Sequence, residues 1–550
     1  MSFAALAVVA TLALGAFAPV ASAAPLVTTP EHPDRPPDGF VVTPREARQT
    51  ADGVGSVMRA RAEHPGLRGT LVIPLYRPGP RYEVTYRLGE KALVDVHVHG
   101  RSGRVLEVWT GPQADTILAR GYEPTIGRSQ NAWYVWLPLA LLFLLPFFDF
   151  RRPLRLLHLD LLALLAFGVS QVFFNRGEID LSVPLAWVPL LYLLTRLLAA
   201  GLRPRRPQGP LVPHVPVAVL LIALLVLIGF RITLNAVDSH VIDVGYASVF
   251  GADRITHGEE LYTRGNAAGT YGPALYMAYV PFEALFPADG PGGYAQAARA
   301  AAVTFDLLLI GCLLAFGARL RRGREGRALG IALAYAWCAY PFSLYALQTN
   351  TNDALVAVLV LLALLAWSSG ALRGAMLGLA AAVKFAPLAL APLLLRGSRP
   401  TMRDSATFVV ALVVVIAVSV AGHLPDGGLR EFWDATIGWQ LGRSSPFSPW
   451  GLYSGLDWVQ AIAKVVAAGL ALSLIALPRR RNLRQLAALA GAVTIAVQLT
   501  AEYWFYLYIV WFAPLVLIAA MGDHRVEPER ASSRAHTSAE PASARLALPG

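Results

Sequence analysis

The sequence predicts an all-α polytopic membrane protein with about eleven spans, one re-entrant hairpin and a small extracytoplasmic α/β domain. Three observations lead to this fold class. Of the 550 residues, 55% are hydrophobic and 15% are charged, whereas soluble domains contain about 25% charged residues. Apolar runs of about 20 residues recur along the chain, and each is long enough to cross a bilayer. Short arginine-rich loops alternate with loops that are poor in arginine.

The arginine-rich loops predict how the spans are oriented. Short loops with an excess of Lys and Arg mark the cytoplasmic face, so we expect the N-terminal domain outside and the C-terminal tail inside a bacterial plasma membrane. The net charge of +11 is then a topology signal, and no nucleic-acid partner is expected. The predicted spans are 132–150, 156–174, 183–201, 212–234, 299–318, 328–345, 353–369, 405–423, 456–477, 485–500 and 503–521.

The N-terminal part, residues 1–128, is predicted to hold a signal segment and a small domain. Residues 1–24 contain an apolar stretch that ends in Ala21-Ser22-Ala23, a small-x-small cleavage pattern. Because no Lys or Arg precedes this stretch, an uncleaved anchor remains open. Thr43-Pro44-Arg45-Glu46 is a capping box, which predicts a helix that runs to about Ala62. Strand-like runs follow at 71–76, 82–88, 92–99 and 105–109.

Two short motifs give this domain, 25–128, a resemblance to a known module. Val94-Asp95-Val96 followed by Gly103-Arg104-Val105-Leu106 resembles the PepSY-type domain found outside bacterial membranes. His97 and His99 alternate on one strand face. They fit a metal pair, but two solvated histidines are the favoured interpretation. The two cysteines, Cys312 and Cys338, fall inside apolar spans, so neither a disulfide framework nor a thiolate metal site is predicted. No cofactor is expected.

The remaining chain divides into three parts: three additional spans within 129–207, a catalytic membrane domain at 208–521 and a disordered tail at 522–550. Residues 374–395 are apolar, yet arginines precede and follow them, so both ends favour the cytoplasm. Lys384 and Pro387 interrupt the middle. This pattern predicts a re-entrant hairpin, or a broken helix that is buried in protein.

Candidate functional residues gather in the loop that follows the 212–234 span. Asp238 and Asp243 carry carboxylates at its start, and Tyr246 lies one helical turn after Asp243. Surface carboxylates at the start of a helix are the simpler alternative. Aromatic residues in such a loop also anchor a protein in the headgroup layer. The further candidates for substrate binding are His257, Tyr262 and Tyr271.

Polar groups beside later spans complete the predicted site. Gln348, Asn350 and Asn352 belong to an amide run, 348–353, that suits sugar hydroxyls, although capping of a helix explains it equally well. In the 424–455 loop, a guanidinium beside hydroxyl groups suits a phosphate. A buried lysine suits one too, unless it only pairs with a carboxylate. These candidates are Lys384, Gln440 and Arg443.

The order of these motifs resembles the GT-C glycosyltransferases, closest to glycosyltransferase family 87, whose members depend on polyprenyl-phosphate-mannose. The resemblance covers about 212–521. Two departures are Tyr-Gly-Pro where Tyr-Pro-Pro is common and the absence of a Gly before Gln348. The motifs are Asp243-x-x-Tyr246, Gly258-x-x-Leu261-Tyr262, Tyr271-Gly272-Pro273, 348–353, 377–387, the Gln440…Arg443-Ser444-Ser445-Pro446…Ser448 run and Trp504-Phe505-x-Leu507-Tyr508…Trp511-Phe512-x-Pro514.

This resemblance implies a fold, a reaction and residue roles. A mannose-like sugar moves with inversion from a polyprenyl-phosphate donor to an extracytoplasmic lipid or glycan acceptor, and no metal is needed. By the same resemblance, Asp243 is the general base, and Lys384 and Arg443 bind the phosphate. A transporter or flippase for a lipid-linked or anionic solute is the first alternative, and a non-catalytic envelope scaffold is the second. The absence of an internal repeat disfavours the transporter.

Overall fold

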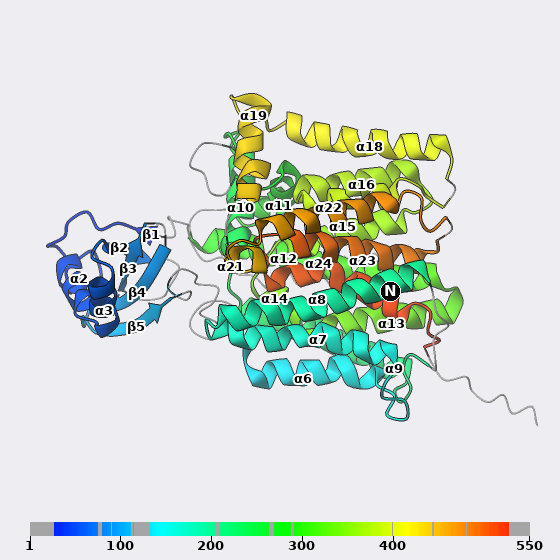
Figure 1. The fold of residues 1–550 in the computed structure, drawn as a ribbon, viewed down its shortest axis with the longest axis horizontal. Coiled ribbons are helices and arrows are strands. Elements are labelled where there is room, and N and C mark those ends of the chain that lie inside the picture. Colours follow the sequence, from blue (N-terminus) through cyan, green and yellow to red (C-terminus); the bar gives the residue numbers. More distant parts are fainter. Residues whose placement is uncertain are drawn as a thin grey trace, which may run out of the picture.

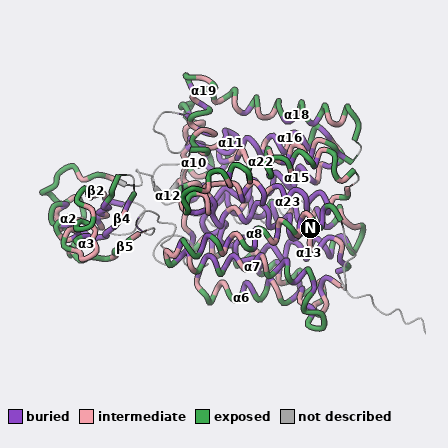
Figure 2. Tube along the Cα trace, viewed as in Figure 1, coloured by how far each residue is buried: buried purple, intermediate pink, exposed green. Residues whose placement is uncertain are grey.

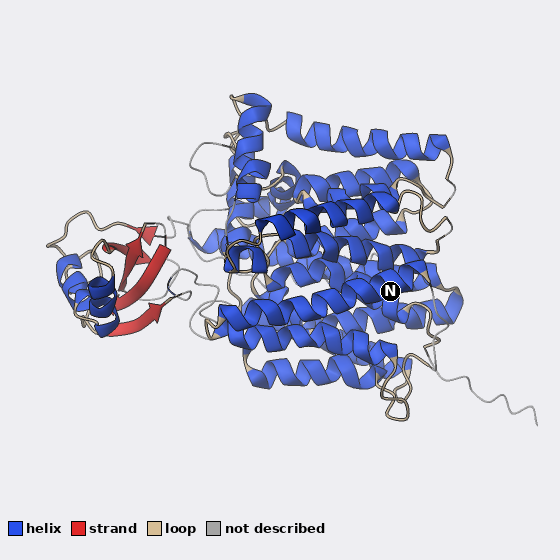
Figure 3. Ribbon diagram, viewed as in Figure 1, coloured by secondary structure: helices blue, strands red, loops and turns tan. Residues whose placement is uncertain are grey.

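The computed structural model describes residues 27–74, 80–89, 91–111, 114, 131–203, 210–262, 269–287, 291–398, 400–442, 445–479 and 481–526. Figure 1 shows a small N-terminal domain beside a large bundle of helices. The strands gather in the small domain, and helices make up the bundle (Figure 3). The predicted signal segment, 1–24, lies outside the described residues.

The N-terminal domain packs two helices on an antiparallel sheet with strand order β1-β2-β3-β4-β5. The predicted capping box is present, because the Thr43 hydroxyl accepts from Glu46 N and the Glu46 carboxylate accepts from Thr43 N. The helix expected to reach Ala62 is interrupted at Gly53. The elements are β1 (Val27–Thr28), α2 (Pro44–Asp52), α3 (Gly55–Glu63), β2 (Arg68–Pro74), β3 (Arg81–Leu88), β4 (Lys91–His99) and β5 (Val105–Thr110).

The two faces of this sheet differ in chemistry. Alternate residues of β3 and β4, such as Val84 and Val96, are buried in the apolar core beneath α2 and α3. The opposite face carries His97, which is fully buried, so the expectation of a solvated histidine is wrong. The reason is that β4 lies between β3 and β5, and both neighbours place carboxylates beside this ring.

The helical bundle follows from residue 131 onward. Its elements are α6 (Trp133–Leu144), η2 (Leu145–Phe147), α7 (Leu156–Asn175), α8 (Ile179–Leu202), α9 (Val217–Asp238), α10 (Asp243–Thr256), α11 (Pro273–Leu285), α12 (Pro291–Leu320), α13 (Gly323–Ala339), α14 (Pro341–Gln348), α15 (Asp353–Leu365), α16 (Gly370–Val383), η3 (Ala386–Leu390), α17 (Ala391–Leu394), α18 (Met402–Ala421), α19 (Gly428–Trp433), η4 (Asp434–Gly438), α20 (Trp439–Gly442), α21 (Pro449–Leu452), α22 (Asp457–Ser473), α23 (Leu483–Thr500), η5 (Tyr506–Tyr508) and α24 (Ile509–Met521).

Among the described residues, six helices are long and apolar enough to cross a membrane, namely α7, α8, α9, α12 from Tyr294, α18 and α23. The pair α13 and α14, bent by 62°, can be counted as a seventh span. The predicted count of eleven is therefore not confirmed. The other predicted spans fall on shorter helices, because breaks divide the apolar runs. At one break, Pro341 starts a new helix, since its ring removes the N–H that would continue α13.

Apolar side chains on the outside of the bundle indicate contact with lipid. On α18, Val410 is 61% exposed and Val418 is 69% exposed, and Figure 2 shows α18 largely exposed at the edge of the bundle. In the 18-residue apolar stretch of α18, only 17% of the residues are buried, whereas 78% are buried in the corresponding stretch of α23 in the interior. Such a wide exposed apolar surface would be unfavourable in water. These helices therefore belong to a membrane protein.

The segment predicted as a re-entrant hairpin, 374–395, reverses direction at Lys384. The helix α16 ends at Val383, and Lys384 is extended, with φ −140° and ψ 136°. The chain then returns through η3 and α17, and the Nε of Arg373 donates to the carbonyl of Leu394 at 2.7 Å. Because the two ends of the segment meet, Lys384 lies at the tip of a hairpin.

The start of the C-terminal tail is ordered, which corrects the prediction of disorder from residue 522. Arg525 accepts a hydrogen bond from Leu211 N at 2.6 Å, and Val526 accepts one from Val212 N at 2.9 Å. Asp523 forms an ion pair with Arg484 at 2.7 Å. Pairing with the segment before α9 thus orders 522–526, which composition alone does not indicate. Residues 527–550 lie outside the described part.

Candidate active site

The amide run 348–353 holds the loop that joins α9 to α10. Asn350 Nδ2 donates to the Ser239 hydroxyl and to the His240 carbonyl, both at 3.0 Å, and its Oδ1 accepts from Asn235 Nδ2 at 2.9 Å. The backbone of Asn350 has φ +50°, a conformation that asparagine tolerates better than most residues. The loop before Asp243 is thereby fixed in position by one buried asparagine.

The two other amides predicted to bind sugar also bond to protein groups. With its amide oriented to satisfy both atoms, Gln348 donates to the Asp238 carbonyl at 2.8 Å and accepts from Asn235 N at 3.1 Å. Asn352 donates from Nδ2 to the Ser248 hydroxyl at 3.0 Å. All three amides are buried. Asn352, the N-cap of α15, makes no side-chain capping hydrogen bond, so capping of that helix does not account for these contacts. Sugar binding by Gln348, Asn350 and Asn352 stays a prediction.

The predicted base, Asp243, is the first residue of α10 and is exposed. Its Oδ1 accepts from Val244 N at 2.8 Å, a position where the helix dipole favours a negative charge. Asp238, the other candidate, ends α9 and is half-buried. Burial raises the pKa of Tyr246, on the first turn of α10, and nearby Arg299 opposes that shift.

The helix α10 packs directly on the amide run. At Gly245, an added Cβ would lie 2.7 Å from the carbonyl oxygen of Asn350, so only glycine permits this approach. One turn later, Ser248 receives the hydrogen bond from Asn352. The helix that begins with Asp243 is therefore fixed against residues 350–352.

The strongest concentration of polar chemistry in this region surrounds Lys384. Its Nζ lies 2.6 Å from Asp353 Oδ1. The same carboxylate accepts from Trp511 Nε1 at 2.8 Å and from the Thr351 hydroxyl. Lys384 is 7% exposed and Asp353 is 1% exposed, so the pair is enclosed. A buried charge pair of this kind needs further hydrogen bonds to offset its desolvation.

Three aromatic rings enclose the ammonium of Lys384. The ring centres lie 5.3 Å from Nζ for Tyr271, 5.8 Å for Tyr508 and 5.4 Å for Trp511. Aromatic faces attract a cation and favour its charged form. An ammonium has three N–H donors, and one of them bonds to Asp353. The arrangement can therefore present a charged donor to an incoming anion.

Consecutive residues connect α10 to Lys384. Asn352 bonds to Ser248 of α10, and the next residue, Asp353, pairs with Lys384. Neighbouring Cα atoms are about 3.8 Å apart, so one short strip contacts both the helix of the predicted base and the lysine. The separation of the Asp243 carboxylate from Lys384 itself remains a prediction.

The other predicted site residues support the segment that carries Tyr271. The Tyr262 hydroxyl donates to the Tyr271 carbonyl at 2.8 Å, and Gln440 Nε2 donates to the Thr270 carbonyl at 3.3 Å. His257 is exposed and bonds to Asp253 one turn earlier. Arg443 lies outside the described residues. The structure thus brings together Tyr262, Tyr271, Gln440 and Lys384, and it leaves His257 at the surface.

A family comparison agrees with this geometry. Residues 270–502 match the model of Glycosyltransferase family 87. This match confirms the resemblance inferred from the motifs, and it indicates a membrane glycosyltransferase. It covers less than half of the chain, and it includes Tyr271, the amide run and Lys384. No curated protein matches the chain significantly. The PepSY-like resemblance of the N-terminal domain is not confirmed.

Three residues that contact Lys384 were not selected from the sequence: Asp353, Tyr508 and Trp511. Two features of the sequence could have indicated them. Asp353 ends the amide run, and the two aromatic residues belong to the last motif of the glycosyltransferase resemblance. The spacing of more than 100 residues between these segments gives no indication that their side chains meet at Lys384.

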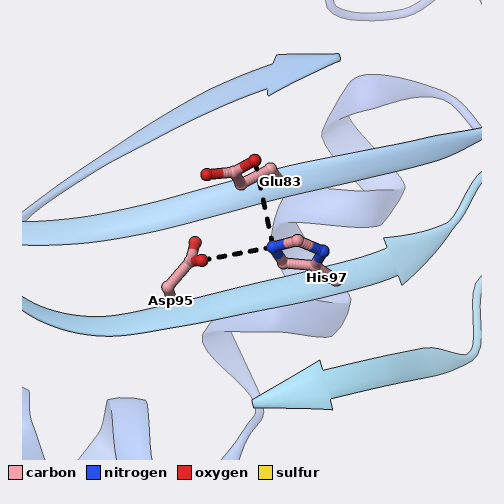
Figure 4. Close-up of side chains that lie close together, drawn as sticks. All are labelled: Glu83, Asp95 and His97. Atoms are coloured by element: carbon pink, nitrogen blue, oxygen red, sulfur yellow. Dashed lines mark hydrogen bonds and ion pairs between the residues drawn. The ribbon is translucent and has the colours of Figure 1, made fainter. Parts of the chain in front are cut away.

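A second polar cluster lies on the N-terminal sheet. His97 Nε2 is 3.2 Å from Asp95 Oδ2 and 3.9 Å from Glu83 Oε2 (Figure 4). One ligand atom from each residue lies within 4.8 Å of the others, so among the described residues this group could hold a metal ion. Asp95 also accepts from the Thr85 hydroxyl at 3.1 Å.

Proposed function

We propose that this chain is a membrane glycosyltransferase that moves a mannose-like sugar from a polyprenyl-phosphate donor to a lipid or glycan acceptor on the extracytoplasmic side. The observation that carries the proposal is the ammonium of Lys384, which lies within the segment that matches family 87 and is enclosed by three aromatic rings. A fixed cation at this position suits the phosphate of such a donor, because buried charges stabilise a leaving phosphate strongly.

Asp243 is the proposed general base. Its carboxylate is exposed at the start of α10, where an acceptor hydroxyl can approach. Asp243 takes the proton from that hydroxyl as its oxygen attacks the anomeric carbon, and the bond from that carbon to the phosphate oxygen breaks. Attack from the opposite face inverts the anomeric centre. A general base contributes roughly 10²–10⁴-fold to the rate of such a step.

Lys384 and Arg443 are the proposed partners of the departing polyprenyl phosphate. Asp353 orients the ammonium through the 2.6 Å contact, and Trp511 and Thr351 in turn hold Asp353. A small apolar cavity of about 20 Å³ adjoins Trp511, between η3 and α23.

The decisive experiment is transfer of a labelled sugar by the purified protein in lipid. A panel of polyprenyl-phosphate sugars is offered with membrane acceptors, and nucleotide-sugars serve as the matched control donors. We expect label in the acceptor only with polyprenyl-phosphate donors, and with inverted linkage. Transfer from nucleotide-sugars, or movement of intact donor across the bilayer without transfer, would contradict the proposal.

The proposed orientation can be tested with cysteine labelling. Glu259 is exposed on the loop after α10, and Arg324 is exposed in the first turn of α13. The native Cys312 and Cys338 are buried and give little background. We expect an impermeant thiol reagent, added to intact cells, to label Glu259→Cys and not Arg324→Cys. Equal labelling of both positions would show that the proposed weave is wrong.

A further inference from the structure

A cavity of about 420 Å³ lies at the end of the bundle away from Asp243. It is bounded by the start of α7, the end of α8, the start of α23 and the end of α24. Leu211 and Val212, just before α9, pair with Arg525 and Val526, which directly follow the cavity residue His524. Since α9 has 22 residues, about 33 Å separates its two ends. The cavity therefore belongs to the face opposite the candidate active site.

Basic side chains dominate the polar lining of this cavity. Four guanidinium groups line it, from Arg155, Arg196, Arg203 and Arg484, and Asp523 supplies the one carboxylate of the lining. Two further carboxylates, Asp149 and Asp160, lie near Arg155 and Arg196 without lining this space. The lining thus carries an excess of positive charge, which favours an anion.

Among the described residues, one buried guanidinium group at this cavity has a donor without a close acceptor. Arg155 is 6% exposed, and its Nη1 makes no hydrogen bond, since the nearest carboxylate, of Asp149, is 3.7 Å away. In contrast, Nε of Arg196 is ion-paired with Asp160 at 3.0 Å, and Nε of Arg484 with Asp523 at 2.7 Å. A buried donor without an acceptor is costly. An anion in the cavity would relieve that cost.

Apolar side chains border the same cavity. Leu154 is 86% exposed, and Leu156 is 39% exposed. Both line the cavity together with Leu157 and small alanines of α8 and α24. Basic pockets between spans on the cytoplasmic side, with apolar surface beside them, suit a headgroup whose acyl chains continue along the helices. A free phosphate would leave this exposed apolar border uncovered.

We propose that the cavity binds the phosphate ester oxygens of an anionic phospholipid from the cytoplasmic leaflet. The guanidinium of Arg155 bonds to the phosphate from within, and Arg203 contacts it from the exposed rim. Arg484 donates to the carbonyls of Ala519 and Ala200, so the helices α8, α23 and α24 that border the cavity are joined directly by this residue.

The test uses the full-length protein in phosphatidylcholine nanodiscs with added phosphatidylglycerol. Binding is measured with a fluorescent phosphatidylglycerol, and inorganic phosphate is the soluble competitor. Arg203→Gln removes an exposed rim cation, so the fold should be unaffected. Arg324→Gln is the matched control, because Arg324 is exposed on the same side but does not line the cavity. One basic residue near a membrane surface corresponds to about a fivefold change in affinity.

We expect Arg203→Gln to weaken phosphatidylglycerol binding by about fivefold and Arg324→Gln to leave it unchanged. Arg155→Gln should weaken it further, with folding checked by monodispersity in detergent. Millimolar inorganic phosphate should compete poorly. Equal binding of phosphatidylcholine and phosphatidylglycerol would overturn the proposal, as would no effect of Arg203→Gln. Strong competition by inorganic phosphate would show that the cavity binds a soluble anion, and it would overturn the proposal that the ligand is a phospholipid.

Discussion

Two ion pairs are buried among the spans, and their surroundings differ. Arg231 of α9 pairs with Asp306 of α12, and Lys384 pairs with Asp353 at the tip of the hairpin. In the first pair, Arg231 also bonds to Ser343 and to the carbonyl of Cys338. In the second pair, the cation faces aromatic rings. The guanidinium of Arg231 is saturated with hydrogen bonds, whereas the ammonium of Lys384 donates one hydrogen bond, to Asp353, among the described residues.

The first pair stabilises the break between α13 and α14. The chain breaks between α13 and α14, and a break at membrane depth frees backbone carbonyls that must find donors. Arg231 supplies one at the carbonyl of Cys338 and also donates to the carbonyl of Ser343 in α14, both at 3.3 Å, while Asp306 accepts from Trp337 Nε1 at 2.9 Å. A buried charge in a membrane protein can therefore be structural, and its hydrogen-bond partners distinguish it from a functional charge.

Disruption of the first pair should have the largest effect. Arg231→Met leaves Asp306 unpaired in the interior and frees the carbonyls of the helix break, which should lower stability by about 3–5 kcal/mol. Thermal unfolding in detergent measures this loss. The double variant Arg231→Met/Asp306→Leu should recover part of the stability and retain transfer activity. Recovery of stability without activity would indicate that this pair is functional as well.

Substitution of Asp243, which belongs to neither ion pair, should affect the transfer rate and not the stability. Asp243→Asn keeps the shape of the side chain but removes the base, so the transfer rate should fall by roughly 10²–10⁴-fold, or about 3–5 kcal/mol of barrier. Asp238→Asn should cost less if Asp238 only holds the loop. Single-turnover transfer with saturating donor makes the measurement.

Both aspartate variants should fold normally, and Asp243→Asn should still bind donor. If Asp238→Asn is inactive and Asp243→Asn is not, the assignment of the base is reversed. If neither change matters, the proposed mechanism fails and a transporter becomes the better interpretation.

The second pair should respond differently from the first. Lys384→Met should weaken donor binding by about 10–100-fold, the value of a charged hydrogen bond of about 1.5–3 kcal/mol. The double variant Lys384→Met/Asp353→Asn should restore stability, because no charge is then left unpaired, but it should not restore donor binding. A direct binding assay with a donor analogue tests this. Donor binding that returns with stability would make the pair purely structural.

His257 should show the smallest effect. Its hydrogen bond to the Asp253 carbonyl, aided by the Asp253 charge, raises its pKa above the usual 6.5. A raised pKa means that the stabilisation is fully present below pH 6.5 in this protein and is lost as the pH rises through the folded-state value. The unfolding midpoint of wild type relative to His257→Gln, followed from pH 5 to about pH 9, measures it. Transfer activity at constant pH should not change.

Local patterns in the sequence predicted much of the architecture. Features that depend on interactions between near neighbours can be predicted from spacing and composition. They are the capping box at Thr43, the strands of the small domain and the long apolar helices from 156 to 500. The number of spans was less predictable. Breaks such as that at Pro341 are tolerated only when a distant side chain, here Arg231, satisfies the freed carbonyls.

The candidate site was predictable in its residue types and less so in its contacts. Lys384 was selected because a charged residue within an apolar run is costly and is often functional. Tyr271 was selected because it belongs to a family motif. That Asp353 is the partner of Lys384 follows from the hairpin, which brings residue 384 beside the start of α15. The amides of 348–353 were selected for sugar, but their neighbours across space are backbone and side-chain groups of α9, the α9–α10 loop and α10.

The sequence by itself determined that this is a helical membrane protein with glycosyltransferase motifs, because hydropathy, charge in loops and motif order are properties of the chain read in one dimension. Only the tertiary structure decided which hydrogen-bond partners each buried charge has among the described residues. Hydrogen bonds and cation–π contacts depend on distances of a few ångströms between segments that are more than 100 residues apart, such as Lys384 and Tyr271 or Asp353 and Trp511. The packing of the helices sets those distances.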